Sequence, residues 1–277
     1  MQPIVIRGGG DIASGTIARL CRAGYCVIVL ECAYPTAIRR DVAFSEVIYK
    51  NQIPGAGNTA ELEGVTMHLA DHAESALEKV SPLHPQMLID ETAESLRILK
   101  PEILVDAILA KKNIGTTIDM APLTIALGPG FYAGRDVKYV IETMRGHTLG
   151  KIIREGEAIP NTGIPGMIAG YGKERVIHAP KGGVLHNVCH ISDFVEMGQV
   201  ISVIESDGEQ VEVTATLTGI LRGILPDGLK IPCGIKMADI DPRRTQISNC
   251  FSISDKARCI AGSVLELVCA YEKGVLL

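Results

Sequence analysis

The first thirty residues carry the clearest pattern of apolar and polar positions. Residues 4–6 form an apolar segment that enters a glycine-rich turn, and apolar residues then recur at helical spacing until Gly24. Residues 25–30 form a continuous apolar run, which is typical of a strand buried on both sides. The helix presents one apolar face made of Ala13, Ile17, Leu20 and Cys21. The pattern predicts a strand, a helix and a second, parallel strand.

Weaker repeats of this pattern follow. The predicted strands cover residues 65–69, 86–89 and 103–109, and the predicted helices cover residues 72–80 and 92–99. The third of these strands brings Asp106 and Lys111 toward its end. Strands that alternate with helices indicate an α/β unit with a parallel sheet.

The first glycine turn matches the GxGxxA form of the dinucleotide-binding fingerprint. An acidic residue ends the second predicted strand, where a ribose-binding acid is expected. Asp11 weakens the match, because its carboxylate repels a pyrophosphate unless it turns away to cap the helix. The glycines also suit a tight strand-to-helix turn without any ligand. The candidate cofactor-binding residues here are Gly8, Gly9, Gly10, Asp11, Ala13 and Glu31.

A second glycine-rich stretch covers residues 128–151 and gathers convergent polar groups. Glycines let backbone amides approach a ligand, and nearby arginine and histidine side chains donate hydrogen bonds to anions. Residues 138–143 favour a strand over a helix, and residues 149–153 favour a second strand of a hairpin. The alternative is a glycine loop whose charges are solvated. The candidate residues are Gly128, Gly130, Gly134, Arg135, Arg145 and His147.

Residues 160–172, PNTGIPGMIAGYG, form the clearest break in composition, and an internal repeat follows it. Residues 179–204 align without a gap on residues 215–240, an offset of 36 residues that matches glycine with glycine and apolar with apolar positions. Two such halves predict a small β-sandwich or barrel. This resembles the barrel-sandwich hybrid of biotinyl and lipoyl domains, although the linking segment 208–215 has no lysine to carry a cofactor.

The last segment predicts a helix that begins after Ser254 and packs through an apolar stripe. The charged residues on either side of its start are either solvated or form one ion network near the anion pocket: Asp241, Arg243, Asp255, Lys256 and Arg258. The chain is thus predicted to be α/β, with a Rossmann-like parallel sheet, a mixed middle segment and a β-rich barrel-sandwich-like domain before the final helix. The predicted divisions are residues 1–110, 111–174, 175–245 and 246–277.

Isolated histidines and cysteines do not predict a metal site. His186, Cys189 and His190 lie close together, but no fourth ligand is evident. His68 and His72 straddle a predicted strand end and are interpreted as surface residues. We therefore expect no structural metal.

Composition limits the classes of partner. A formal net charge of -5 and the absence of Trp argue against nucleic acid binding, and no apolar run is long enough to cross a membrane. The start of the chain shows no export signal, and the eight scattered cysteines are typical of reduced cytoplasmic thiols. We expect a cytoplasmic protein. Self-association into a homo-oligomer is left open.

Five motifs in fixed order support a family resemblance: GGGDIASG, GPGFYAGRDVKYVIETMRGHTLGK, PNTGIPG, DIDPR and SDKAR. On these the chain resembles the selenium-dependent molybdenum hydroxylase accessory proteins of the YqeB type, which are grouped with xanthine dehydrogenase accessory proteins. The resemblance implies a cytoplasmic maturation factor whose partner is the molybdenum hydroxylase apo-enzyme. It supplies no catalytic residues, so enzymatic activity is left open.

A molybdopterin-type cofactor, often joined to a nucleotide, is polyanionic and would suit both glycine loops. Under this hypothesis residues 8–11 and 130–147 line one cleft, with Arg135 and Arg145 on phosphate and His147 or a cysteine near the reactive end. Two alternatives remain: an NAD(P)-dependent oxidoreductase, in which Glu31 favours NAD, and a non-catalytic docking module for the apo-hydroxylase.

Overall fold

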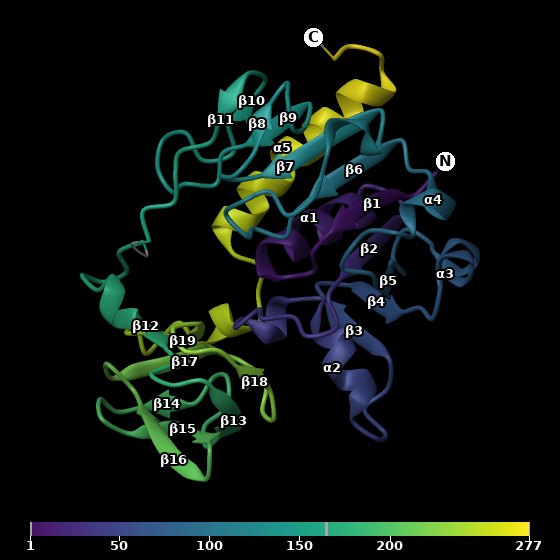
Figure 1. Cartoon of the computed structure of the whole chain (residues 1–277). Helices are drawn as coiled ribbons and strands as arrows, with labels where there is room; N and C mark the ends of the chain where they lie inside the picture. The colour runs from purple at the N-terminus through teal and green to yellow at the C-terminus, as the bar shows by residue number, and fades with distance from the viewer. Residues whose placement is uncertain (1, 164–165, 277) are drawn as a thin grey trace. The chain divides into compact units, whose positions relative to one another are not determined.

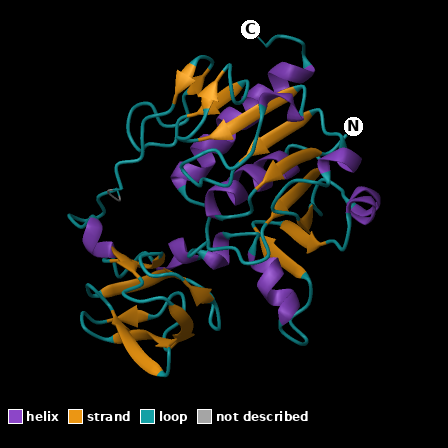
Figure 2. Cartoon of the chain, in the orientation of Figure 1, coloured by secondary structure: helices purple, strands orange, loops and turns teal. Residues whose placement is uncertain are grey.

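A computed structural model describes residues 2–163 and 166–276 of the chain, which fall into two compact units. Unit 1 is the described part of Met1–Pro35, Ala43–Thr162 and Ile253–Leu277, and unit 2 is that of Thr36–Val42 and Gly163–Ser252. The compositional break at residues 160–172 lies where the chain leaves unit 1, and residues 164 and 165 within it are outside the described part. Figure 2 shows that unit 1 mixes helices with strands, whereas strands dominate unit 2.

Unit 1 is built on a nine-stranded sheet in the described chain, in the order β10-β9-β7-β6-β1-β2-β5-β4-β3 (Figure 1). The strands are β1 (Ile4–Arg7), β2 (Val27–Glu31), β3 (Thr59–Leu62), β4 (Val65–Leu69), β5 (Gln86–Ile89), β6 (Ile103–Asp106), β7 (Leu123–Leu127), β9 (Tyr139–Ile141) and β10 (Ile152–Ile153). All pair in parallel except β3 and β10, which are antiparallel to β4 and β9. A small separate ribbon pairs β8 (Tyr132–Ala133) with β11 (Gly156–Glu157).

The apolar runs of the sequence explain this sheet, because its central strands are buried on both faces. Val5 and Ile28 belong to a cluster that packs against α3 (Ala73–Lys79) and α4 (Leu96–Leu99), while α1 (Asp11–Arg22) and α5 (Asp255–Glu272) lie together on the sheet as a pair (Figure 1). A further helix, α2 (Glu46–Gln52), contacts β3 and β4. The predicted strand–helix–strand opening and the hairpin of β9 and β10 are both present.

Close packing fixes where α5 begins. A Cβ added at Gly15 would lie 2.7 Å from the Cβ of Ala257, so the first turns of α1 and α5 cross with almost no side chain between them. Ser254 caps α5 by accepting a hydrogen bond from the Ala257 N–H at 3.2 Å, as predicted. The crossing therefore places the N-terminus of α5 beside that of α1.

Unit 2 consists of two four-stranded antiparallel sheets in its described residues, ordered β12-β19-β17-β14 and β16-β15-β13-β18. Its strands are β12 (Val176–His178), β13 (Gly183–Asn187), β14 (Phe194–Val195), β15 (Val200–Ser206), β16 (Glu209–Thr214), β17 (Gly219–Ile224), β18 (Lys230–Ile231) and β19 (Lys236–Asp241). The starts of β13, β14 and β15 each recur 36 residues later as those of β17, β18 and β19.

The two halves of the repeat exchange their short strands. β14 pairs with β17 and β18 pairs with β13, so each half completes the other half's sheet. Gly183 and Gly219 occupy equivalent positions: a Cβ at either would overlap a backbone carbonyl, that of Glu205 or of Asp241. The repeat read from the sequence thus corresponds to a structural repeat.

These observations give a mixed α/β chain with one large, mostly parallel sheet and additional antiparallel sheets. Within the described residues, no helix combines the length and hydrophobicity needed to cross a membrane.

Candidate functional site

The loops that follow β1, β6, β7 and β9 converge at the carboxyl ends of the parallel strands. A Cβ at Gly8 would lie 2.8 Å from the Ala107 carbonyl oxygen, and one at Gly130 would lie 2.6 Å from the Lys112 backbone nitrogen. The loop after β6 therefore contacts the loops after β1 and β7. Ligands of open α/β sheets commonly bind at this edge, where the strand order reverses.

The same geometry explains why glycine occurs at these positions. Gly8 and Gly130 have φ angles of 97° and 105°, and Gly128 would place a Cβ 2.6 Å from the Thr143 hydroxyl oxygen. Protein atoms lie close to the position of each missing Cβ, so the packing of one loop on another by itself requires glycine here. These three glycines hold neighbouring loops together, and that packing positions the polar groups of the edge.

The first glycine turn is fixed by Glu31 and by the segment before α2. Glu31 accepts hydrogen bonds from the Gly9 and Cys32 backbone N–H groups at 2.7 and 2.8 Å, and the Ser45 N–H donates to the Gly9 carbonyl at 3.0 Å. Gly10 is the N-cap residue of α1, with no side-chain hydrogen bond at the cap, and Asp11 lies in the first turn. Ala13 is fully buried.

Beneath this turn lies a buried polar network formed by Arg7, Thr116 and Asp106, each at most 2% exposed. Arg7 Nη1 donates to the Thr116 hydroxyl at 2.6 Å, and this hydroxyl donates to Asp106 Oδ2 at 2.6 Å. Burial raises the pKa of Asp106, while the Thr116 hydrogen bond and the Arg7 charge oppose that shift. The network joins the ends of β1 and β6 to the loop at residue 116.

Three cations gather at the carboxyl edge. Burial lowers the pKa of Lys256, and the positive charges of Arg145 and Lys111 lower it further; Asp11 and Glu142 act in the opposite direction. Lys256 belongs to the first turn of α5, which the Gly15–Ala257 crossing holds against the start of α1. We name Lys111, Arg145 and Lys256 the edge cations.

The loop after β9 is held in place by buried and paired charges. Glu142, 3% exposed, accepts hydrogen bonds from the Met144 and Ile159 N–H groups at 2.6 and 2.8 Å. Arg145 pairs with Asp255 through two hydrogen bonds of 2.8 Å. The pair leaves the Arg145 side chain half exposed, so the guanidinium remains accessible at the edge.

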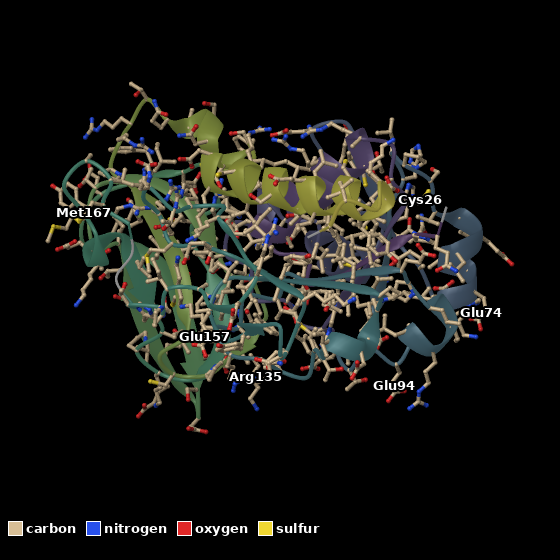
Figure 3. All side chains as sticks on the ribbon, turned by 90° about the horizontal axis from the view of Figure 1, so that it is seen from above. Cys26, Glu74, Glu94, Arg135, Glu157 and Met167 are labelled. Atoms are coloured by element: carbon tan, nitrogen blue, oxygen red, sulfur yellow. The ribbon has the colours of Figure 1, made fainter. Side chains whose placement is uncertain are left out.

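The structure does not add Arg135 to this cluster. Its guanidinium bonds Asp136 and lies 4.8 Å from the Tyr132 ring centroid, and the further charge acting on it is Glu157 on β11. Figure 3 shows Arg135 and Glu157 together on the outside of unit 1. Gly134 lies in the same turn as Arg135, and His147 is exposed in the loop between β9 and β10. Of the predicted residues Arg135, Arg145 and His147, Arg145 therefore lies near Lys256, and the cleft between the two glycine loops stays a prediction.

A reactive cysteine is not evident beside the first glycine turn. Burial, followed by the Glu31 charge, raises the pKa of Cys32 to about 12, so its thiol stays protonated at neutral pH. In the described residues, no group of three or more His, Cys, Asp or Glu side chains could hold a metal ion. The expected lack of a structural metal stays a prediction.

Sequence reasoning missed Glu142 and Thr116 as parts of this edge. A glutamate directly after the apolar run of β9 was a usable signal, because an unpaired buried carboxylate is costly and must find partners. Thr116 carried no comparable signal, since its role depends on the 109-residue separation from Arg7 along the chain.

Comparisons with known proteins add a sequence relative of unstated activity. No protein-family model matches the chain. The uncharacterized protein YqeB of Escherichia coli (strain K12) is 47% identical over 265 residues, which cover 96% of this chain and 47% of that protein. The chain therefore spans about half the length of the curated relative that it matches.

Solved structures match weakly. An aspartoacylase family protein from Mesorhizobium loti has a TM-score of 0.28 at 14% identity, covering 88% of this chain and 86% of its own. A succinylglutamate desuccinylase from Silicibacter has a TM-score of 0.27 at 15% identity, covering 86% and 84%. Scores at this level do not support transfer of an activity to this chain.

These findings correct the expectation of molybdenum hydroxylase maturation. YqeB is described without an activity, and the solved structures are of desuccinylases and aspartoacylases. We therefore withdraw the membership in a selenium-dependent hydroxylase accessory family, the maturation role and the apo-hydroxylase partner that rested on it. The oxidoreductase and docking-module alternatives gain no support from the comparisons and are also set aside.

Expectations that depend on other observations stay predictions. They are the binding of a molybdopterin-type cofactor or NAD(P), the exclusion of nucleic acid, the cytoplasmic location, homo-oligomer formation, the division into domains and the ligand-binding roles of the glycine-loop residues.

Proposed function

We propose that unit 1 binds a small phosphorylated molecule at the carboxyl edge of its parallel sheet. The observation that carries the proposal is the half-buried Lys256, which shares its surroundings with Arg145 and Lys111. Two like charges near a desolvated ammonium are unfavourable, and a bound anion would relieve the repulsion. The same edge holds the N-terminus of α1, whose backbone N–H groups and dipole favour negative charge.

The sheet topology supports the location. β1 lies between β6 and β2, and the chain reaches these neighbours in opposite directions across the sheet, as in a Rossmann-like fold. We assign that fold to unit 1 and a barrel-sandwich hybrid to unit 2, on the exchanged strands of its repeat. In the Rossmann-like arrangement, Glu31 is held beside the glycine turn, where its carboxylate would accept a hydrogen bond from a ribose hydroxyl.

Isothermal titration of the full chain with pyrophosphate, AMP and NAD⁺ tests the proposal. We expect Lys256→Gln and Lys111→Gln each to weaken phosphate-ligand affinity by about ten-fold, the loss of one charge-assisted contact. Lys138→Gln is the matched control, because Lys138 precedes β9 at the opposite edge of the sheet. Glu31→Ala should weaken AMP and NAD⁺ binding more than pyrophosphate binding, because pyrophosphate has no ribose and loses only the support that Glu31 gives the glycine turn.

Two results would contradict the proposal. One is the absence of binding heat with all three ligands. The other is an equal loss of affinity in Lys138→Gln and Lys256→Gln, which would indicate general charge attraction rather than a defined edge site.

A further inference from the structure

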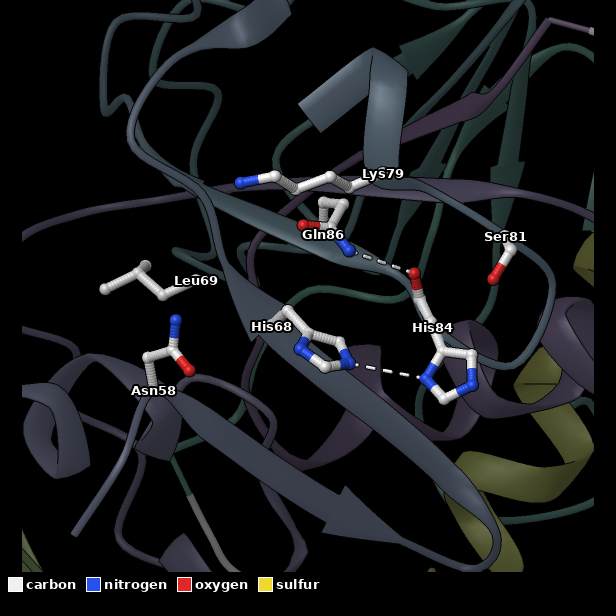
Figure 4. Close-up of a pocket in the computed structure, with 7 residues that line it drawn as sticks. All are labelled: Asn58, His68, Leu69, Lys79, Ser81, His84 and Gln86. Carbon is white, nitrogen blue, oxygen red and sulfur yellow. Dashed lines mark hydrogen bonds between the residues drawn. The ribbon is translucent and has the colours of Figure 1, made fainter. Parts of the chain in front are cut away.

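A second pocket lies in unit 1 between β4, β5 and the end of α3, apart from the edge cations (Figure 4). Its volume is about 380 Å³, within the lower range for small-molecule sites. β3 approaches from the other side, because the Leu69 N–H donates to the Asn58 carbonyl oxygen at 3.0 Å. The polar residues that line the pocket are Asn58, His68, Lys79, Ser81, His84 and Gln86.

The lining is rich in hydrogen-bond donors and contains no carboxylate. Lys79 supplies an ammonium from the last turn of α3, and Asn58 and Ser81 supply an amide and a hydroxyl. Gln86 is 2% exposed, and its Nε2 donates to the His84 carbonyl oxygen at 3.1 Å, which fixes the segment that carries His84. This charge balance favours an anion over a metal cation.

Two histidines of the lining contact each other directly, with 3.3 Å between His68 Nε2 and His84 Nδ1 (Figure 4). In the neutral pair one nitrogen carries the shared proton and the other accepts it. Burial and the neighbouring His84 lower the pKa of His68, so the free His68 ring resists protonation. Lys79 on α3 also faces the pocket, whereas the β3 neighbour Asn58 does not titrate.

We propose that this pocket binds a small oxyanion, a phosphate or carboxylate group, and that both histidines become protonated as it binds. The anion would accept hydrogen bonds from both imidazolium rings and from Lys79. Its negative charge would offset the repulsion that two protonated rings this close together would otherwise feel. Binding to the neutral pair therefore takes up two protons and weakens as the pH rises through the histidine pKa values.

Proton NMR of the full chain, followed through the histidine ring signals, tests this inference. His68→Gln and His84→Gln assign the two signals, and the remaining histidines serve as internal controls. Inorganic phosphate and malonate are titrated separately at about pH 6 and about pH 8, values on either side of the ordinary histidine pKa. We expect either or both anions to raise the pKa of His68 and His84, with affinity about ten-fold lower at the higher pH.

Lys79→Gln should weaken binding by about five-fold or more, whereas Lys273→Gln, a change at an exposed lysine after α5, should leave it unchanged.

A stronger response to phosphate identifies a phosphate site, and a stronger response to malonate identifies a carboxylate site. The inference is overturned if neither anion moves the two signals more than those of the other histidines. It is also overturned if Zn²⁺ perturbs both signals at equimolar amounts while the anions do not. Lys256→Gln should not alter these titrations, which separates this pocket from the edge cations.

Discussion

The buried charges of unit 2 and the edge cations of unit 1 follow opposite rules. In unit 2, Asp239 is 1% exposed and lies between Arg175 and Arg222, accepting hydrogen bonds from both guanidinium groups. In unit 1, Lys256 is surrounded by Arg145 and Lys111 as well as by two carboxylates. The first network neutralises a buried charge with partners from the same sheet and the adjoining segment, whereas the second leaves a partly buried ammonium beside two other cations that the nearby carboxylates only partly offset.

The difference separates stability from binding. Removing one partner of a buried, hydrogen-bonded charge network costs several kcal/mol, because the remaining charges lose their compensation. A cluster of like charges adds little to stability and can attract an external anion. We therefore expect variants of the buried networks to lower the free energy of unfolding strongly, and variants of the edge cations to change it little.

Asp239→Ala should have the largest effect. Two guanidinium groups would lose their carboxylate inside unit 2, which we expect to cost about 3–5 kcal/mol of unfolding free energy. Urea unfolding followed by circular dichroism measures the loss, and Glu212→Ala, an exposed acid on β16, is the control. A change in Asp239→Ala no larger than in the control would show that the network is not needed for stability.

Thr116→Val should come next. Its hydroxyl both accepts from Arg7 and donates to Asp106, so valine leaves two buried polar groups without this partner. The expected loss is about 2–3 kcal/mol, from unsatisfied hydrogen bonds. The same urea assay applies, with Thr117→Val as control because that adjacent side chain is exposed. Equal midpoints for the two variants would argue that solvent replaces the lost hydroxyl.

Local patterns predicted much of the fold. The continuous apolar runs of β1 and β2 and the helical stripe between them identified the parallel unit, and the 36-residue repeat identified the paired sheets of unit 2. Spacing along the chain gave no information about β3, which pairs with β4 at the edge of the sheet, or about the exchange of β14 and β18 between halves. Those pairings depend on tertiary packing.

The candidate site was predictable only where its chemistry is local. The glycine turn at Gly8 and the acid at Glu31 lie as the motif predicts, and Arg145 joins the edge cations. Lys256 was a candidate for an ion network, but its proximity to α1 follows from the crossing at Gly15, which no spacing rule reveals. The sequence alone does not tell whether a glycine approaches a ligand or another loop, because both require the same missing side chain.

Lys256→Gln should leave the chain as stable as before or more stable by about 1 kcal/mol, because it removes a partly desolvated charge. Since the pKa of Lys256 is lowered in the folded state, its charge disfavours folding at neutral pH, and this penalty disappears as the pH rises through the folded pKa toward the unfolded one. Urea midpoints in the absence of phosphate measure the effect, with Lys138→Gln as control. A loss of about 2 kcal/mol or more, obtained from the midpoint and slope of the urea transition, would place Lys256 among the charges that stabilise the fold.

Arg145→Gln tests the smallest effect, the exposed pair with Asp255. The Arg145 hydrogen bonds hold the pKa of Asp255 at about 2, below its ordinary value of 3.8. The pair therefore stabilises the fold above the unfolded pKa, and this contribution is lost as the pH falls through about 2. Both side chains are half exposed or more, so we expect the pair to contribute only about 0.5 kcal/mol to the free energy of unfolding at neutral pH, and less at high salt.

Carbon-detected NMR titration of Asp255 is the direct measurement. Arg145→Gln should return the pKa of Asp255 toward the ordinary value, whereas Arg154→Gln, on the exposed turn after β10, should not. An unchanged Asp255 pKa in Arg145→Gln would mean that the first turn of α5 alone holds the carboxylate charged, and Arg145 would then be free to bind an anion without loss of that stability.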